Sequence, residues 1–276
     1  MANLKELFNL NDYADIKAIL EVAGELGKSE NIEVYVVGGF VRDLILGKTL
    51  NDIDLMTVGD GISFAQTLAN KLGVRKIIPF KKYGTAIIPY NKIQIEVATA
   101  RTESYKKNSR KPSEVIYTDL HGDLIRRDFT INAMAMDIRP DYFGDFTDPY
   151  GGINDIDKKI LRTPLDPDET FSEDPLRMMR AAYFSSSLQF KIDRVCYESI
   201  KRQSHRIEIV SMERIRDEFI KILRTVKPSV GLVILQKTGL MSVVFPEIHL
   251  MYGMDQTSEW KHKDIFSHTL QVVDNA

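Results

Sequence analysis

The stretch IEVYVVGGFVRDLILGKTLNDIDLMT, residues 32–57, constrains the fold of this chain more than any other. An apolar, β-branched run ends at Gly38 and Gly39, a short helical pattern follows, and a second strand carries Asp52 and Asp54. Because side chains alternate across a strand, the two carboxylates project from one face. Neighbouring carboxylates without a partner resist ionising together, and a divalent cation such as Mg²⁺ removes this conflict. The sequence therefore predicts a metal site at Asp52 and Asp54.

The glycine turn before these acids has the features of a phosphate-binding site. Glycine lets the backbone approach an anion closely, and the start of the following helix presents backbone N–H groups to it. Arg42 adds a planar donor that always carries a positive charge, and Asp43 can cap or brace the turn. A double glycine alone is most often an ordinary turn. Gly38, Gly39 and Arg42 followed by two acids on the next strand instead predict a phosphate-binding site.

The segment GGFVRDLILGKTLNDID closely resembles the signature of the class II nucleotidyltransferases related to DNA polymerase β, the family of bacterial tRNA CCA-adding enzymes and poly(A) polymerases. The resemblance implies an α+β fold, in which a small mixed β-sheet nucleotidyltransferase head is followed by an all-helical neck and body. It also implies Mg²⁺ as cofactor, and the tRNA 3′ end, ATP and CTP as partners. Fold alone does not fix a substrate, so the rest of the chain has to support this interpretation.

Length and composition set broad bounds. With 276 residues the chain can build a substantial core and more than one domain. The formal net charge of −2 does not by itself indicate a nucleic-acid binder, although an average can hide local basic patches. A single cysteine, Cys196, excludes an intrachain disulfide framework and fits a reducing compartment. No signal peptide or membrane-spanning run is visible, so we expect a cytoplasmic protein without a membrane partner. The oligomeric state stays open.

The strand KIQIEVATAR supplies a candidate third acid. Its apolar residues occupy one face, and Gln94 and Glu96 occupy the other. This partition matches the earlier strand, so we expect helices to cover one face of the sheet and the other face to be available for chemistry. Glu96 can join the metal site, as the corresponding position does in some relatives, or it can be a solvated glutamate. Arg101, which ends this motif, can contact phosphate or an acidic neighbour.

The segment 102–123 is polar and poorly periodic, and we expect it to be a mobile loop. Its basic residues are clustered: Lys106, Lys107, Arg110 and Lys111. Such clusters are usually just solvated, but a basic loop beside a nucleotide site can also guide RNA or the incoming nucleotide. In the family that this chain resembles, a loop in this region affects the switch between cytidine and adenosine addition.

The segment DLIRRDFTINAMAMDI resembles the second family motif. The resemblance implies that Arg127 contacts the nucleotide or its triphosphate, that Asp128 contacts the ribose hydroxyls, and that Asn132 positions nearby loops. Arg126 binds RNA phosphate or braces the site. Adjacent helical residues point about 100° apart, so the two arginines should have different roles. The alternative is a helix end with salt-bridged arginines.

A third motif, EDPLRMMRAAYF, has the residues needed to read a nucleobase. Asp174, Arg177 and Arg180 recur every three residues, which predicts that they share one helix face. A carboxylate accepts from an exocyclic amine and an arginine donates to a ring nitrogen, which matches cytosine and adenine but not guanine or uracil. Ordinary helix-entry rules also explain the acids. Relatives often have another arginine where this chain has Tyr183.

Helical patterns dominate the rest of the chain and define the expected domains. We expect a catalytic head at 1–150, a helical neck with the base-recognition motif at 151–225, and a helical body at 226–276. Glu213, Arg214 and Glu218 resemble a further family motif that organises the neck, for which a salt-bridge role is favoured. The last residues, WKHKDIFSHTLQVVDNA, resemble the start of an HD domain. One histidine, His268, cannot build its metal site, so we expect the sequence to be truncated there.

The motifs together predict template-independent addition of CMP and AMP to the tRNA 3′ end. In this interpretation Asp52 and Asp54 hold two Mg²⁺ ions while an RNA 3′-hydroxyl attacks the α-phosphorus in line and pyrophosphate leaves. The sequence does not separate CCA addition from A-adding, CC-adding or poly(A) polymerase activity. The alternatives from other classes are a non-catalytic RNA-binding module and a phosphohydrolase that acts through the HD portion.

Overall fold

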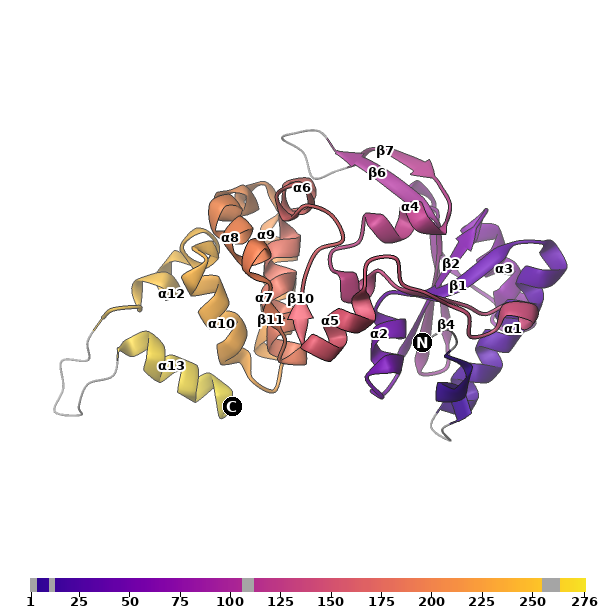
Figure 1. The fold of residues 1–276 in the computed structure, drawn as a ribbon, viewed down its shortest axis with the longest axis horizontal. Coiled ribbons are helices and arrows are strands. Elements are labelled where there is room, and N and C mark those ends of the chain that lie inside the picture. Colours follow the sequence, from indigo (N-terminus) through magenta and orange to yellow (C-terminus); the bar gives the residue numbers. More distant parts are fainter. Residues whose placement is uncertain (1–3, 10–12, 106–111, 255–263) are drawn as a thin grey trace. The chain divides into compact units, whose positions relative to one another are not determined.

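The computed structural model describes residues 4–9, 13–105, 112–254 and 264–276, which fall into two compact units (Figure 1). The first unit comprises Met1–Ser104 and Ser113–Asn154, and the second is mainly Asp155–Ala276. A mixed sheet dominates the first unit and helices dominate the second, so the α+β prediction is confirmed. No helix in the described part of the chain is both long enough and apolar enough to cross a membrane.

The sheet of the first unit has seven strands in the order β3-β4-β5-β2-β1-β8-β9. Their bounds are β1 Glu33–Val37, β2 Asp52–Val58, β3 Ile78–Phe80, β4 Thr85–Tyr90, β5 Ile93–Thr99, β8 Ala135–Asp137 and β9 Phe146–Thr147. The pair β2 and β5 is parallel, and the other neighbours are antiparallel. This parallel pair matters for function because it places the two acid-bearing strands side by side.

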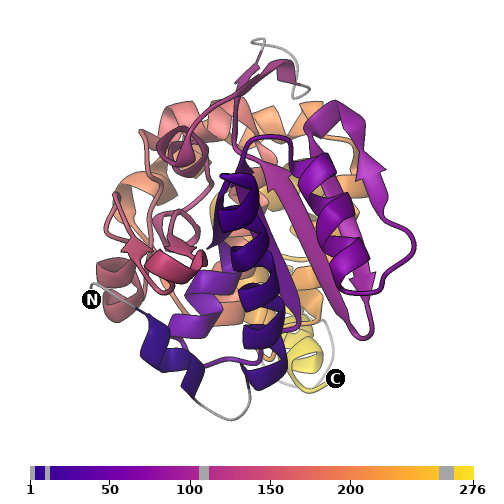
Figure 2. The ribbon, with the colours of Figure 1, turned by 90° about the vertical axis from the view of Figure 1, so that its right-hand side faces the viewer.

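Two helices, α1 (Ala14–Glu30) and α3 (Gly61–Lys71), cover one face of this sheet, as Figure 2 shows. The apolar residues from Ile16 to Leu26 recur at helical spacing, which predicts a helix that stops at Gly27. The helix instead continues to Glu30 and ends at Asn31 in the left-handed conformation (φ 54°). Two glycines of this helix, Gly24 and Gly27, allow it to pack closely against neighbouring segments. A Cβ at Gly24 would lie 1.9 Å from the carbonyl oxygen of Ile138, and one at Gly27 would lie 2.5 Å from Val34 Cγ1.

The opposite face of the sheet is only partly open. Met56 follows Asp54 on the same face of β2, yet it is buried in a second small core. Helix α4 (Leu120–Ile125) contributes Leu124 to this core, whose other buried members are Tyr35, Val37, Ala100 and Ala135. The prediction that this whole face is available for chemistry is therefore wrong. Among the described residues, the part of this face around the acids, and from there toward β4 and β3, is open.

The segment 102–123 is also more regular than we expected. Its described residues form β6 (Arg101–Tyr105), β7 (Pro112–Tyr117) and α4, with β6 paired to β7. Hydrophobic periodicity could not reveal this pairing, because a two-stranded ribbon does not have to bury one regular face. The basic residues Lys106, Lys107, Arg110 and Lys111 lie outside the described residues. The remaining short elements of the unit are η1 Lys5–Asn9, α2 Gly39–Ile45, η3 Lys81–Tyr83, η4 Thr130–Asn132 and η5 Pro140–Tyr142.

The second unit is built around α7 (Leu176–Leu188), which packs against α9 (Met212–Leu223) and α10 (Pro228–Lys237). Its other helices are α6 Pro167–Glu173, α8 Arg194–Gln203, η6 Ser204–Ile209, α11 Leu240–Val244, α12 Pro246–Leu250 and α13 Ile265–Asp274, and α5 Gly152–Lys158 spans the boundary between the units. Cys196 is fully buried, as expected for a core residue. The helical prediction holds apart from one short parallel pair, β10 Ile160–Leu161 with β11 Lys191–Ile192.

Candidate active site

Three carboxylates lie together on the open part of the sheet. In the parallel register of β2 and β5, Asp54 is directly opposite Glu96, and Asp52 is opposite Gln94. Alternation along each strand puts Asp52, Asp54 and Glu96 on the same face. Asp54 is partly buried, whereas Asp52 and Glu96 are exposed. The structure thus brings the two predicted acids together, and the neighbouring strand adds the third.

Burial and the neighbouring acids disfavour ionisation of Asp54. Burial, followed by the neighbouring charge of Glu96, raises the pKa of Asp54 to about 6, and Asp52 contributes in the same direction. Arg127 and Arg42 lower this pKa without restoring the ordinary value. Oxygen ligands with excess negative charge suit a divalent cation, so the residues present fit the expected metal. Within the described residues, no three His, Cys, Asp or Glu side chains are arranged to hold a metal by themselves. Substrate phosphates and water would therefore complete the ligand set.

This raised pKa predicts how the stability of the metal-free protein depends on pH. A carboxyl whose pKa is raised by folding stabilises the fold while it is protonated, and this contribution is lost as the pH rises through the folded-state value. The window lies between the ordinary value of 3.8 and about 6. We expect the melting temperature of the chelator-treated parent to fall relative to Asp54→Asn as the pH rises through this window. Equal melting temperatures at every pH would contradict the prediction.

The glycine turn lies at the end of β1, where the backbone conformation of Gly38 favours glycine and Arg127 lies close to it. The φ of +68° at Gly38 is unfavourable for other residues, and a Cβ would lie 2.6 Å from Nη1 of Arg127. The backbone N–H of Gly38 donates to the carbonyl oxygen of Met134 (3.1 Å), and Gly39 begins α2. The turn and Arg127 therefore lie next to each other beside the acids.

Arg42 is buried and is held by two side chains of the protein. Its Nη1 donates to Oδ1 of Asn132 (2.6 Å), while Nε and Nη2 donate to the two carboxylate oxygens of Asp43 (2.9 and 2.8 Å). Asn132 in turn donates to Oδ1 of Asp128 (3.0 Å), which also accepts from the backbone N–H of Phe129 (2.8 Å). These bonds connect the glycine turn to η4. The contact of Asp128 with a ribose and that of Arg42 with a phosphate stay predictions.

The sequence reasoning missed one residue of this site, Asp123 in α4. Its side chain is buried and binds both neighbouring arginines: Oδ2 accepts from Nε and Nη2 of Arg127 (3.1 and 2.8 Å), and Oδ1 pairs with Arg126. Burial alone would raise the pKa of Asp123, but the two arginines hold it below its ordinary value. The spacings i, i+3 and i, i+4 in DLIRR were the available signal.

Asp123 also changes the interpretation of the two arginines. We expected them to have different roles, and the structure shows that they share one carboxylate through different oxygens. The other contacts of the two arginines differ. Nε of Arg126 donates to the carbonyl oxygen of Arg101 (2.6 Å), whereas Arg127 extends toward Gly38 and donates to the carbonyl oxygen of Asn132 (3.4 Å). Salt bridges are thus present at this helix end and hold Arg127 at the turn, while its contact with a nucleotide stays a prediction.

In the second unit, the candidate base-reading residues do not share one helix face. Asp174 ends α6 and precedes α7, so only the two arginines lie on α7. Its Oδ1 accepts from the backbone N–H of Leu176 (3.2 Å), and its Oδ2 pairs with Arg214 (3.2 Å). Arg177 Nη1 pairs with Glu173 (3.3 Å). The prediction failed because a turn at Pro175 separates two helices where spacing alone suggested one.

Arg180 lies next to a buried acid and an aromatic ring. Its Nη1 is 4.0 Å from Oε1 of Glu218, and its guanidinium is 5.2 Å from the ring centre of Phe184. Glu218 on α9 is buried and also pairs with Lys221 (2.8 Å). The predicted ion pairs of Arg214 and Glu218 are present.

Tyr183, which replaces a common family arginine, lies 5.0 Å from Phe184 between ring centres. His268 is exposed on α13.

A sheet face that gathers three carboxylates beside a glycine turn and an arginine defines the first unit as a candidate nucleotidyltransferase. Two family models match the chain: the poly A polymerase head domain over residues 34–162, and the probable RNA and SrmB-binding site of polymerase A over residues 189–251. The chain belongs to the class II family of CCA-adding enzymes and poly(A) polymerases. The resemblance seen in the sequence is thereby confirmed.

Curated relatives have two different names. An A-adding tRNA nucleotidyltransferase of Geobacter sulfurreducens is 36% identical over 84% of this chain and 26% of its own length. A CCA-adding enzyme of Lactobacillus helveticus is 38% identical over 69% of this chain and 46% of its own length. The chain therefore spans half or less of these relatives.

Solved structures resemble the chain at the level of both fold and sequence. The Thermotoga maritima CCA-adding enzyme in complex with tRNA has a TM-score of 0.75 and 29% identity, over 89% of this chain and 56% of that one. CCA-adding enzyme structures with CTP and with ATP each have a TM-score of 0.76, at 29% and 30% identity, over 88% and 89% of this chain and 55% and 56% of theirs.

Proposed function

We propose that this chain adds CMP and AMP, from CTP and ATP, to the 3′ end of tRNA. The observation that carries the proposal is the pairing of Asp54 with Glu96 beside the Gly38 turn and Arg127. Relatives named as tRNA nucleotidyltransferases, and similar structures that contain tRNA, CTP or ATP, support it. Recognition of tRNA without a template suits contacts to shape and backbone.

The residues of the first unit divide the chemistry between them. Asp52 and Asp54 would hold Mg²⁺, and Glu96 would join them at the attacking hydroxyl. When bound, Mg²⁺ lowers the barrier to deprotonating that hydroxyl and neutralises the triphosphate charge. Gly38 leaves space for the guanidinium of Arg127 at the turn, where this arginine would supply a fixed positive charge to the triphosphate. Asp123 keeps this charge in place, so little reorganisation is needed during in-line attack at the α-phosphorus.

We assign base selection to Asp174 and Arg177 in the second unit, with Arg180 as a further nucleotide contact. A carboxylate and an arginine match the pairing edges of cytosine and adenine. Arg177→Ala should reduce the preference for CTP and ATP over GTP and UTP by about tenfold, since each good base contact contributes about 1–3 kcal/mol of discrimination. Competition assays with all four nucleotides measure this ratio. An unchanged ratio in a folded variant would remove Arg177 from base selection.

Several finer assignments belong to the same proposal. We propose residues 1–150 as the catalytic head, 151–225 as the neck with base recognition, and 226–276 as the body with the start of an HD domain. We also propose Mg²⁺ as the working cation and the cytoplasm, where tRNA is processed, as the location. Asp128 is assigned to the ribose hydroxyls and Asn132 to positioning the turn, which its bond to Arg42 supports.

Extension of three labelled tRNAs tests the proposed function. The tRNAs end at the discriminator base, at C and at CC, and each is offered CTP, ATP or both. We expect two C additions and one A addition in the correct order. Growth by A only after CC indicates an A-adding enzyme, C addition alone indicates a CC-adding enzyme, and long A tails indicate a poly(A) polymerase. No extension of any tRNA would contradict transfer by this chain.

A further inference from the structure

The face of the sheet that carries the acids continues beyond Glu96 to the edge of the sheet. In the antiparallel registers, Glu96 on β5 is opposite Ile87 on β4, and Ile87 is opposite Ile78 on β3. Asp54, Glu96, Ile87 and Ile78 therefore form one row across four strands. Strands lie about 4.8 Å apart, so Ile78 is about 10 Å from Glu96, a distance comparable with the size of one nucleoside.

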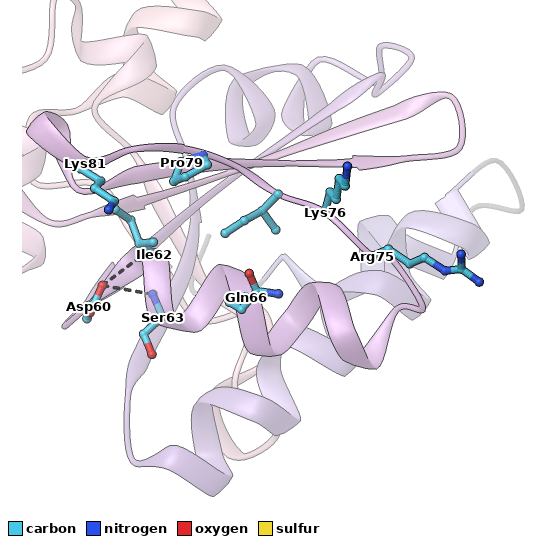
Figure 3. A pocket seen from close by; sticks show the side chains of 9 residues that line it. Asp60, Ile62, Ser63, Gln66, Arg75, Lys76, Pro79 and Lys81 are labelled. Atoms are coloured by element: carbon cyan, nitrogen blue, oxygen red, sulfur yellow. Dashed lines mark hydrogen bonds between the residues drawn. The ribbon is translucent and has the colours of Figure 1, made fainter.

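Alternation along β3 separates its side chains between the two faces. Ile77, Pro79 and Lys81 line a pocket beside α3, on the face that the helices cover (Figure 3). Ile78 and Phe80 consequently face the acid side. They are large apolar side chains with 51% and 44% of their surface exposed, and Ile87 between Ile78 and Glu96 is partly exposed. We call Ile78, Phe80 and Ile87 the apolar shelf.

The two sides of the acid group differ in chemistry. On the β1 side lie the glycine turn and Arg127, which suit the charged triphosphate. On the β4 side lies the apolar shelf, which offers no positive charge but can contact a sugar and the face of a base. In-line transfer puts the attacking hydroxyl and the leaving pyrophosphate on opposite sides of the α-phosphorus, which would lie at the acids. Since the triphosphate matches the β1 side, the β4 side remains for the substrate that supplies the hydroxyl.

We propose that the apolar shelf binds the 3′-terminal nucleoside of the acceptor RNA, with its base against Phe80 and its sugar toward Ile87 and Glu96. This assignment rests on the proposed function and adds the acceptor subsite to it. Stacking on an aromatic ring tolerates different bases, which an acceptor ending in varied nucleotides requires. Beyond Phe80, Tyr83 has Lys82 and Arg101 over its ring, each 5.5 Å from the centre, which suits the preceding backbone.

The KM values of variants at two adjacent isoleucines, Ile78 and Ile77, test the role of the apolar shelf. Ile78→Ser should raise the KM for tRNA about tenfold and leave the KM for CTP unchanged, and Phe80→Ala should behave the same way. Ile77→Ser is the matched control, because this neighbouring isoleucine lines the pocket on the opposite face. Melting curves identify variants that have lost their fold. An unchanged KM for tRNA in folded shelf variants, or an equal rise in Ile77→Ser, would overturn the proposal.

A binding measurement separates this inference from the proposed function. RNA with a photoreactive adenine at its 3′ end is irradiated with the full chain, and the adducts are mapped by mass spectrometry. Adducts within residues 78–87 support the shelf even if the chain extends no tRNA. Adducts confined to other peptides, or none, would overturn the assignment to RNA and leave the apolar side chains to a protein partner. Failed extension with adducts on the shelf would contradict the proposed function alone.

Discussion

Asp54→Asn should lower nucleotide incorporation by about 10³-fold or more, the largest effect expected for any single substitution in the chain. Asp54 lies between Asp52 and Glu96 and would be a ligand of the metal that neutralises the triphosphate. Asparagine keeps the size of the side chain but removes the charge. Because the negative charges of this acid group disfavour each other, the variant should melt no lower than the parent in the absence of metal. Single-turnover incorporation into labelled tRNA measures the loss.

Asp60→Asn provides the matched control for this experiment. Asp60 lies just after β2, and its carboxylate caps α3 by accepting from the backbone N–H groups of Ile62 and Ser63 (3.0 and 3.1 Å). Asparagine is a comparable helix cap, so this variant should retain both stability and incorporation. If Asp54→Asn keeps more than about a tenth of the parent rate, Asp54 is not a metal ligand in the reaction.

Asp123→Ala should cause the second large effect, on stability as well as on activity. Its buried carboxylate pairs with Arg126 and Arg127, and removing it leaves two partly buried guanidinium groups without this partner. Breaking a buried ion pair in this way costs about 3–5 kcal/mol. For a unit of this size the melting temperature should fall by about 10 °C. Arg127 would also lose its fixed position beside Gly38, so incorporation should fall in the molecules that remain folded.

Asp119→Ala on the same helix shows what loss of an ordinary contact costs. Asp119 caps α4 by accepting from the backbone N–H of Gly122 (2.9 Å), and the loss of a cap costs about 1 kcal/mol. Calorimetry of both variants makes the comparison. Equal losses for Asp119→Ala and Asp123→Ala would show that Asp123 acts only within its helix and does not hold the arginines at the turn.

Local patterns in the sequence were sufficient to predict much of the candidate site. The two-residue spacing of Asp52 and Asp54 fixes their common face, since alternation along a strand is a backbone property. The end of β1 at Gly38 and the helix after it followed from the residue types alone. The parallel pairing that puts Glu96 opposite Asp54 joins strands about 40 residues apart, and no local pattern contains this information.

The errors of the sequence reasoning have a common physical cause, which is tertiary packing. Glycine often follows the last residue of a helix, which favoured a stop at Gly27. Gly27 instead lies inside the helix, where it allows close contact with Val34. Met56 shares the face of Asp54, yet residues from distant segments bury it. Asp174 pairs with Arg214, 40 residues further along the chain. In each case the local preference was compatible with two outcomes, and distant residues decided between them.

A crystal structure of the chain with Mn²⁺ and a non-hydrolysable CTP analogue tests the central claim most directly, because anomalous scattering locates the metal. The account predicts metal density contacting carboxylate oxygens of Asp52 and Asp54, with the triphosphate at the Gly38 turn beside Arg127. Metal at another site, or a triphosphate remote from this turn, would contradict it.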